Sequence, residues 1–189
     1  MLFKLRLHEA LPVFSMLSLI LLKKTINTLL SAGALVVVEN PIINLSAPNA
    51  EFFLSNGSLT SLSAYKGHMV SLWFVATWCS GCAQGNEVLN SSYSSLGQKG
   101  VKVIELELYN DLGYSGPPIA EFVSSYAPAA YSGGAVTPAY ASYNMALTYD
   151  PKGYLDIYYL LSPGGKILYT NSPLATTLSQ LAAAINSSR

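Results

Sequence analysis

Apolar residues in the middle of the chain form two short runs that a helical pattern separates. Residues 70–77 (VSLWFVAT) are almost wholly apolar, which predicts a central strand that is buried on both faces. Residues 101–108 (VKVIELEL) alternate between apolar and charged positions, with one slip at Ile104, and predict a second strand. Between them, residues 80–97 carry apolar positions at helical spacing, namely Leu89, Tyr93 and Leu96. A strand–helix–strand unit of this length implies parallel pairing and a right-handed connection.

The second half of the chain adds helices and a hairpin. Pro117 and Pro118 open a helical stretch, because proline is tolerated in the first turn of a helix. Residues 156–162 and the returning KILYT segment flank a Pro-Gly-Gly turn and predict two antiparallel strands. Residues 173–186 predict a closing helix with one apolar face.

Residues 128–150 are rich in Ala, Tyr, Ser and Gly, and we interpret them as an insertion that holds a short helix at 139–147. A further segment at 52–62 precedes the first buried strand. The element order is then β–α–β–α–insertion–β–β–α. This order predicts an α/β fold with a central mixed sheet flanked by helices, and it resembles the thioredoxin fold with an N-terminal extension and an insertion before the final hairpin.

The first forty residues differ from the rest of the chain. Residues 10–22 and 25–38 are mostly apolar, and Lys23 and Lys24 separate them. Neither run alone reaches the roughly 20 residues that cross a bilayer as a helix, but the second has the anatomy of a secretory signal. We therefore expect residues 1–40 to be a signal sequence or membrane anchor, with residues 41–189 as a domain on the exterior face of the membrane. An amphipathic or buried helix of the domain itself is the alternative.

The composition excludes some classes of function. Only 11% of the residues are charged and the formal net charge is zero, against roughly 25% charged residues in ordinary globular proteins. The chain has neither a basic run that would suit nucleic acid nor an acidic tail. We expect no nucleic-acid partner.

The two cysteines of the chain lie together in the stretch TWCSGC at residues 77–82. Cys79 follows the predicted strand and precedes the predicted helix, so its thiol would lie at a helix N-terminus, where a thiolate is favoured. A thiolate is the nucleophile in disulfide exchange, and Cys82 would be near enough to form a disulfide with Cys79. We predict an exposed, attacking Cys79, a more buried, resolving Cys82, and Trp78 as a flat apolar lip. The other residues expected to line this site are Thr77, Ser80 and Gly81.

Three other interpretations of the pair are less well supported. A structural zinc ion needs four ligands, and His8 and His68 are the only histidines in the chain. A purely structural disulfide would close a loop too short to constrain the unfolded chain much. A thiol peroxidase would need a cation near the peroxide, and the arginines are at positions 6 and 189. Dithiol–disulfide exchange remains the favoured chemistry, with no cofactor and no metal.

The sequence resembles the TlpA/ResA-like redoxins, the AhpC/TSA type of the thioredoxin superfamily, over most of residues 47–108. VSLWFVATWCSGC is similar to the strand and motif of that family, and Ala47-Pro48 with Phe52 is similar to its opening. YYLLSPGGKILY resembles the family's final hairpin. The resemblance implies a thioredoxin-like fold, the two cysteine roles, and protein thiols or disulfides as partners, with a membrane electron donor.

The sequence departs from this family at two positions. Where thioredoxins carry a cis-proline that faces the cysteines, this chain has Asp156 or a nearby residue, unless Pro138 takes the place. Where many relatives have a helix-kinking proline, this chain has Glu87, a candidate proton acceptor for Cys82 and otherwise a solvated carboxylate. The missing proline leaves open a binding module of this fold that handles copper without turnover.

Overall fold

The structure, a computed structural model, describes residues 43–188 of the chain. The predicted signal or anchor at residues 1–40 lies outside the described part. Within that part, none of the helices combines the length and the apolar character needed to cross a membrane.

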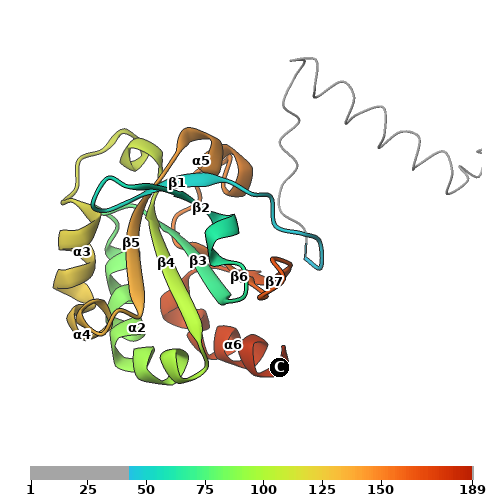
Figure 1. Cartoon of the computed structure of the whole chain (residues 1–189). Coiled ribbons are helices and arrows are strands. Elements are labelled where there is room, and N and C mark those ends of the chain that lie inside the picture. Colours follow the sequence, from blue (N-terminus) through green and yellow to red (C-terminus); the bar gives the residue numbers. More distant parts are fainter. Residues whose placement is uncertain (1–42, 189) are drawn as a thin grey trace, which may run out of the picture. The chain divides into compact units, whose positions relative to one another are not determined.

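One mixed sheet organises the domain (Figure 1), and its seven strands follow the spatial order β2-β1-β5-β4-β3-β6-β7. β3 and β4 are parallel over their whole length, with Met69 opposite Val101 and Val75 opposite Glu107. Helix α2 connects them, as the sequence pattern predicts. The bounds of the strands are β1 (Glu51–Leu54), β2 (Leu59–Ser61), β3 (Met69–Val75), β4 (Val101–Glu107), β5 (Val136–Ala141), β6 (Ile157–Leu161) and β7 (Ile167–Asn171).

The helices surround this sheet, and Figure 1 shows α3 and α4 beside β5. The longest helix in the described part of the chain, α2, packs against the closing helix α6. Short 3-10 turns follow β2 and β4. The bounds of the helical segments are η1 (Leu62–Tyr65), α2 (Ser80–Gln98), η2 (Tyr109–Gly113), α3 (Ile119–Tyr126), α4 (Pro128–Ser132), α5 (Tyr143–Tyr149) and α6 (Leu174–Ser187).

The side chains of β3 alternate between two apolar cores, because successive residues of a strand point to opposite faces. Trp73 and Val75 belong to the core that α2, α3, α4 and α6 cover. Leu72 and Phe74 belong to the other core, which α5 and the N-terminal hairpin help to form. Every residue of β3 is buried, as its continuous apolar sequence predicts for a central strand.

The predicted final hairpin and closing helix are confirmed. β6 and β7 pair antiparallel across the Pro-Gly-Gly turn, with Tyr158 opposite Asn171. In α6 the predicted apolar positions are buried, namely Leu174, Leu178, Leu181 and Ile185.

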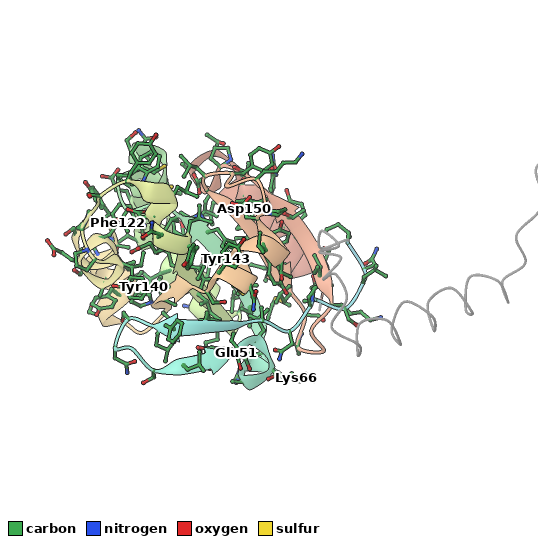
Figure 2. The ribbon with its side chains drawn as sticks, turned by 90° about the horizontal axis from the view of Figure 1, so that it is seen from above. Glu51, Lys66, Phe122, Tyr140, Tyr143 and Asp150 are labelled. Atoms are coloured by element: carbon green, nitrogen blue, oxygen red, sulfur yellow. The ribbon has the colours of Figure 1, made fainter. Side chains whose placement is uncertain are left out.

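The stretch at 128–150 contains a strand that the sequence interpretation missed. Residues 139–141, expected in a short helix, belong to β5, and the helix α5 begins only at Tyr143. β5 lies inside the sheet, parallel to β4 and antiparallel to β1. Pro138 makes this strand difficult to predict from the sequence, because proline lacks an N–H and is rare in central strands. Figure 2 shows Tyr140 of β5 between Phe122 of α3 and Glu51 of β1.

Candidate redox site

Both cysteines lie at the first turn of α2, directly after β3. Cys79 is the N-cap of the helix, and its Sγ accepts a hydrogen bond from the backbone N–H of Cys82 at 3.2 Å. Its own N–H donates to the Ala76 carbonyl at 3.0 Å, which closes the turn from strand to helix. The sequence prediction of Cys79 at a helix N-terminus is therefore correct in geometry.

The two thiols differ in accessibility, though less than expected. Cys82 is 0% exposed, while Cys79 is 8% exposed and also counts as buried. The expectation of an exposed Cys79 is wrong in degree, because its thiol folds back over the first turn of α2 to accept the Cys82 N–H. Burial is the main cause that raises the pKa of the Cys82 thiol far above its usual range, and the hydrogen bond with Cys79 adds to the effect. Cys82 therefore holds its proton until a nearby group takes it.

The other residues predicted to line the site take different places. Trp78 is 39% exposed beside Cys79, as expected for a lip, and Ser80 is also exposed. A methyl group added at Gly81 would lie 3.8 Å from the Cys79 Sγ, an ordinary contact, so the site does not require glycine there.

Thr77 is buried rather than open to the site, and Asp111 holds it. Thr77 donates its N–H and its hydroxyl to the two carboxylate oxygens of Asp111, each at 2.9 Å. The indole Nε1 of Trp78 donates to the Asp111 carbonyl at 2.8 Å. Sequence reasoning missed Asp111, because nothing local marks a residue that acts across 34 positions.

Asp111 takes this position through an unusual turn. Asn110, Asp111 and Leu112 all have positive φ, at 53°, 47° and 58°. Left-handed backbone is costly for residues with a Cβ, although Asn and Asp tolerate it best. Contacts with the rest of the protein therefore hold the turn in this conformation, and they include the hydrogen bonds that Asp111 accepts from Thr77 and Trp78.

A shallow groove opens beside this turn. It has a volume of about 320 Å³, and Tyr114, which lines it, also contacts Trp78 with tilted rings whose centroids are 4.9 Å apart. Half-buried Glu107 lines the groove, and burial, with the nearby Asp111 carboxylate, raises the pKa of Glu107 to about 7.

Glu87, the candidate proton acceptor, is on the wrong side of α2. It is exposed, and five residues separate it from the buried Cys82. Five residues of an α-helix turn through about 500°, which places the two side chains on different faces. Glu87 is a solvated helix carboxylate, the alternative that the sequence also allowed.

Asp156 lies at or near the position where the resemblance predicts the facing proline. It directly precedes β6, which pairs with β3, whereas Pro138 lies in β5 on the far side of β4. Asp156 is 2% exposed and has a φ of 65°. Its Oδ1 accepts hydrogen bonds from Trp73 Nε1 at 2.6 Å and from Leu174 N at 3.1 Å.

A second buried carboxyl lies on the same face of the sheet. Glu105 of β4 is 0% exposed, and its Oε1 accepts a hydrogen bond from Asn86 Nδ2 of α2 at 2.7 Å. Burial is the main cause that raises the pKa of Glu105, to about 8. Glu105 occupies a charged position of an alternating strand pattern, which is typical of a solvent-facing carboxylate, so its burial could not be predicted from the sequence.

No three or more His, Cys, Asp or Glu side chains within residues 43–188 are grouped to hold a metal ion.

Comparisons with known proteins fit this geometry. The model of the AhpC/TSA family matches residues 38–155, more than half of the chain. A search of the curated proteins finds no match.

Several solved structures share the fold. A protein from Chlorobium tepidum assigned as thiol:disulfide interchange protein DsbE has a TM-score of 0.53 at 23% identity, covering 77% of this chain and 99% of that one. A thiol:disulfide interchange protein from Bacteroides sp. has a TM-score of 0.57 at 18% identity, covering 77% and 91%. ScoI of Arabidopsis thaliana, solved with copper bound, has a TM-score of 0.55 at 14% identity, covering 76% and 99%. The expected thioredoxin-like fold and the redoxin resemblance are confirmed.

Proposed function

Because this chain belongs to the AhpC/TSA family, we propose that its cysteine pair makes it a thiol–disulfide oxidoreductase that acts on protein substrates, on the exterior face of a membrane. The observation that carries the proposal is the placement of Cys79 and Cys82 in the first turn of α2. There the Cys79 Sγ accepts a backbone N–H, and Cys82 lies behind it without exposure to solvent.

The first step is an attack by Cys79. Its thiolate displaces one sulfur of a substrate disulfide, so that a Cys79–substrate disulfide forms and the other substrate sulfur leaves as a thiolate. The Cys82 N–H stabilises negative charge on the Cys79 Sγ, because a hydrogen bond to the charged form favours that form.

The second step is the resolution by Cys82. Its sulfur attacks the Cys79 Sγ, the mixed disulfide breaks, and the second substrate sulfur leaves with the electron pair. The substrate has gained two electrons and two protons, and the protein holds a Cys79–Cys82 disulfide. Because Cys82 is buried, a protein substrate reaches Cys79 first, which fixes the order of the two steps.

Serine variants of the full chain test this scheme through the reduction of a protein disulfide. Cys79→Ser should abolish turnover, and Cys82→Ser should accumulate the mixed disulfide with substrate, which non-reducing electrophoresis detects. Full activity of Cys79→Ser would overturn the proposal. Tight copper binding by the reduced protein, together with no disulfide exchange, would favour a copper-handling module of the same fold.

The exterior location is supported by the sequence of residues 1–40, with its basic residues ahead of an apolar run. A membrane electron donor would then re-reduce the disulfide. A reporter enzyme that is active only outside the cytoplasm, fused after residue 189, tests this location. Reporter activity that depends on residues 1–40 is expected, and an inactive reporter on the full chain would contradict the exterior location.

A further inference from the structure

Four polar side chains are buried together behind Cys82, and the two cysteine steps described above assign no role to them. Trp73, Asn86, Glu105 and Asp156 are each 0% to 2% exposed. Three of their polar atoms have no hydrogen-bond partner among residues 43–188: Asn86 Oδ1, Glu105 Oε2 and Asp156 Oδ2. A buried polar atom without a partner is costly, so the three atoms together call for a physical explanation.

A proton on Glu105 explains two of the three unpartnered atoms. Asn86 Nδ2 donates to Glu105 Oε1 at 2.7 Å, which leaves Asn86 Oδ1 and Glu105 Oε2, the second oxygen of each group, unpartnered. An ionised Glu105 could only accept hydrogen bonds, as the amide oxygen does. A protonated Glu105 can donate from Oε2 to the amide oxygen, so that acid and amide form a paired ring of two hydrogen bonds. The raised pKa of Glu105 agrees with this protonated state at neutral pH.

The third atom belongs to the carboxyl group of Asp156, whose other oxygen accepts two hydrogen bonds. Asp156 Oδ1 accepts the Trp73 indole N–H and the Leu174 backbone N–H, and the second donor lies at the N-terminal end of α6. Burial is the main cause that raises the pKa of Asp156 above its ordinary value, and the two hydrogen bonds, which favour the charged form, offset part of that effect. Asp156 Oδ2 therefore stays free, buried and able to accept a proton.

Asp156 lies against the first turns of α2. A methyl group added at Gly85 would be 3.6 Å from Asp156 Oδ1, and Gly85 follows Cys82 by three residues, which puts the two on one helix face. The Asp156 charge also acts on the pKa of the Cys82 thiol. The carboxylate and the resolving thiol thus share one buried compartment.

We propose that Asp156 takes up the proton of Cys82 in the resolving step. Glu105 keeps its own proton, which it donates to the amide oxygen of Asn86, so that Asp156 carries the single negative charge beneath the Cys82 thiol. This proposal rests on the proposed function. In the step, the Cys82 S–H bond breaks and its proton moves to Asp156 Oδ2. The Cys82 sulfur then forms the bond to Cys79 Sγ, and the substrate sulfur leaves with the electron pair of the mixed disulfide.

The titratable groups that face Asp156 come from the elements packed around it. They are Cys82 of α2, Glu105 on β4 and Tyr158 on β6. No basic side chain contributes to the pKa of Asp156, so no neighbouring cation holds it ionised when Cys82 gives up its proton.

A stoichiometric reaction of the full chain separates the two cysteine steps. The reduced protein is mixed with a symmetrical aromatic disulfide whose released thiol is coloured. One equivalent appears when Cys79 attacks, at a rate that depends on reagent concentration. A second equivalent appears when Cys82 resolves the mixed disulfide, at a rate independent of that concentration.

Asp156→Asn is the test variant, because it keeps Oδ1 as an acceptor and asparagine tolerates positive φ. At pH 7 its second phase should be about 100-fold slower than in the wild type, the usual contribution of a positioned base, while the first phase is unchanged. The rate should then rise about tenfold per pH unit, because hydroxide has to remove the Cys82 proton.

Asp150→Asn is the matched control. Asp150, labelled in Figure 2, is also a buried aspartate with an unpartnered Oδ2, and it accepts the Tyr154 N–H at 2.9 Å. It follows α5, whose buried residues belong to the core on the other face of the sheet. This variant should show both phases at wild-type rates.

The outcomes separate the proposal from the function on which it rests. A wild-type protein that releases only one equivalent would contradict the proposed function. A wild type that releases two, together with an Asp156→Asn variant whose second phase is as fast, would overturn the role of Asp156. If Asp156→Asn does not fold, the wild-type second phase decides: a flat rate between pH 7 and pH 8 supports the proposal, and a tenfold rise contradicts it.

Infrared spectroscopy tests the proton on Glu105 independently of activity. The difference spectrum of wild type minus Glu105→Gln at pH 7 should show the carbonyl band of a protonated carboxyl group in a dry site, and the difference spectrum of wild type minus Asp156→Asn should lack that band. Glutamine has the donors and acceptor of the protonated acid, so the fold should survive. Absence of that band from the Glu105→Gln difference spectrum would overturn the assignment.

Discussion

The indole Nε1 of Trp73 donates to Oδ1 of Asp156 at 2.6 Å, which joins two residues 83 positions apart in the buried layer between the sheet and α2. The same oxygen accepts the Leu174 N–H, so one carboxyl group ties β3, the start of β6 and the start of α6 together. Asp156 is thus a structural junction as well as the proposed proton acceptor.

Trp73→Phe should cost the protein about 2 kcal/mol or more of unfolding free energy. It removes a buried hydrogen bond to a charged group and leaves space where the larger ring was. Denaturant unfolding at neutral pH measures the loss. Trp78→Phe is the control: its indole also donates one hydrogen bond, but the side chain is 39% exposed, so its loss should be about 1 kcal/mol or less. Equal losses would contradict the importance of the Asp156 junction.

Asp156→Pro should not fold to the native state, although the resemblance to thioredoxins predicts a proline at or near this position. Proline fixes φ near about −65°, whereas Asp156 has a φ of 65°. Asp156→Asn and Asp156→Gly should both fold, because these residues tolerate the left-handed region. Circular dichroism and thermal unfolding compare the three. A stable Asp156→Pro protein would show that the local backbone differs from the one described.

Two glycines of α2 should respond to alanine in opposite ways. A methyl group at Gly85 would lie 2.6 Å from the Trp73 ring, and rigid neighbours leave it no room. Gly85→Ala should therefore destabilise the protein by about 1–3 kcal/mol. A methyl group at Gly97 meets nothing within 4 Å, so Gly97→Ala should gain about 0.5–1 kcal/mol from helix propensity. Denaturant titration of both variants checks the prediction, and a neutral Gly85→Ala would contradict it.

Stability should fall as pH rises because of Glu105. The pKa of Glu105 is about 8 in the folded protein, against an ordinary value of 4.5. Between these values the native state binds a proton that the unfolded chain releases, so the unfolding free energy decreases with pH, by at most about 1.4 kcal/mol per pH unit for this one group. The contribution is fully present below about pH 4.5 and is lost as the pH rises to about 8.

Glu105→Gln should therefore give a flatter stability curve between about pH 5 and pH 8 than the wild type. Glu107 should contribute a similar but smaller decrease of the unfolding free energy with pH in both proteins, because its pKa is also raised, to about 7. Glu87→Gln serves as the control, since Glu87 is exposed on α2 and its removal should leave the wild-type slope. An unchanged slope in Glu105→Gln would mean that Glu105 is ionised in the folded protein.

The sequence alone was enough to predict the central part of the fold. A continuous apolar run identifies β3 as a buried central strand, and the spacing in α6 identifies its buried face. Those patterns record burial directly, because each side chain's environment depends on the local period. The position of Cys79 followed in the same way, from the boundary between a strand and a helix.

The rest depends on contacts that no local pattern records. β5 contains Pro138 and has no clear alternation, so its place beside β4 is decided by tertiary pairing. Glu105 reads as one of the polar positions of an alternating strand, yet α2 covers it and supplies Asn86 as its partner. Asp111 and Asp156 act on residues 34 and 83 positions away.

The helix cap at Cys79 links the redox state of the protein to its stability. In the dithiol form, the Cys79 Sγ caps α2 by accepting the Cys82 N–H at 3.2 Å, and a disulfide draws that sulfur into a covalent bond with Cys82. An interaction that is stronger in the dithiol than in the disulfide makes the couple more oxidising, by about 30 mV for each 1.4 kcal/mol. The residue that begins the helix therefore also helps to set the direction in which electrons flow.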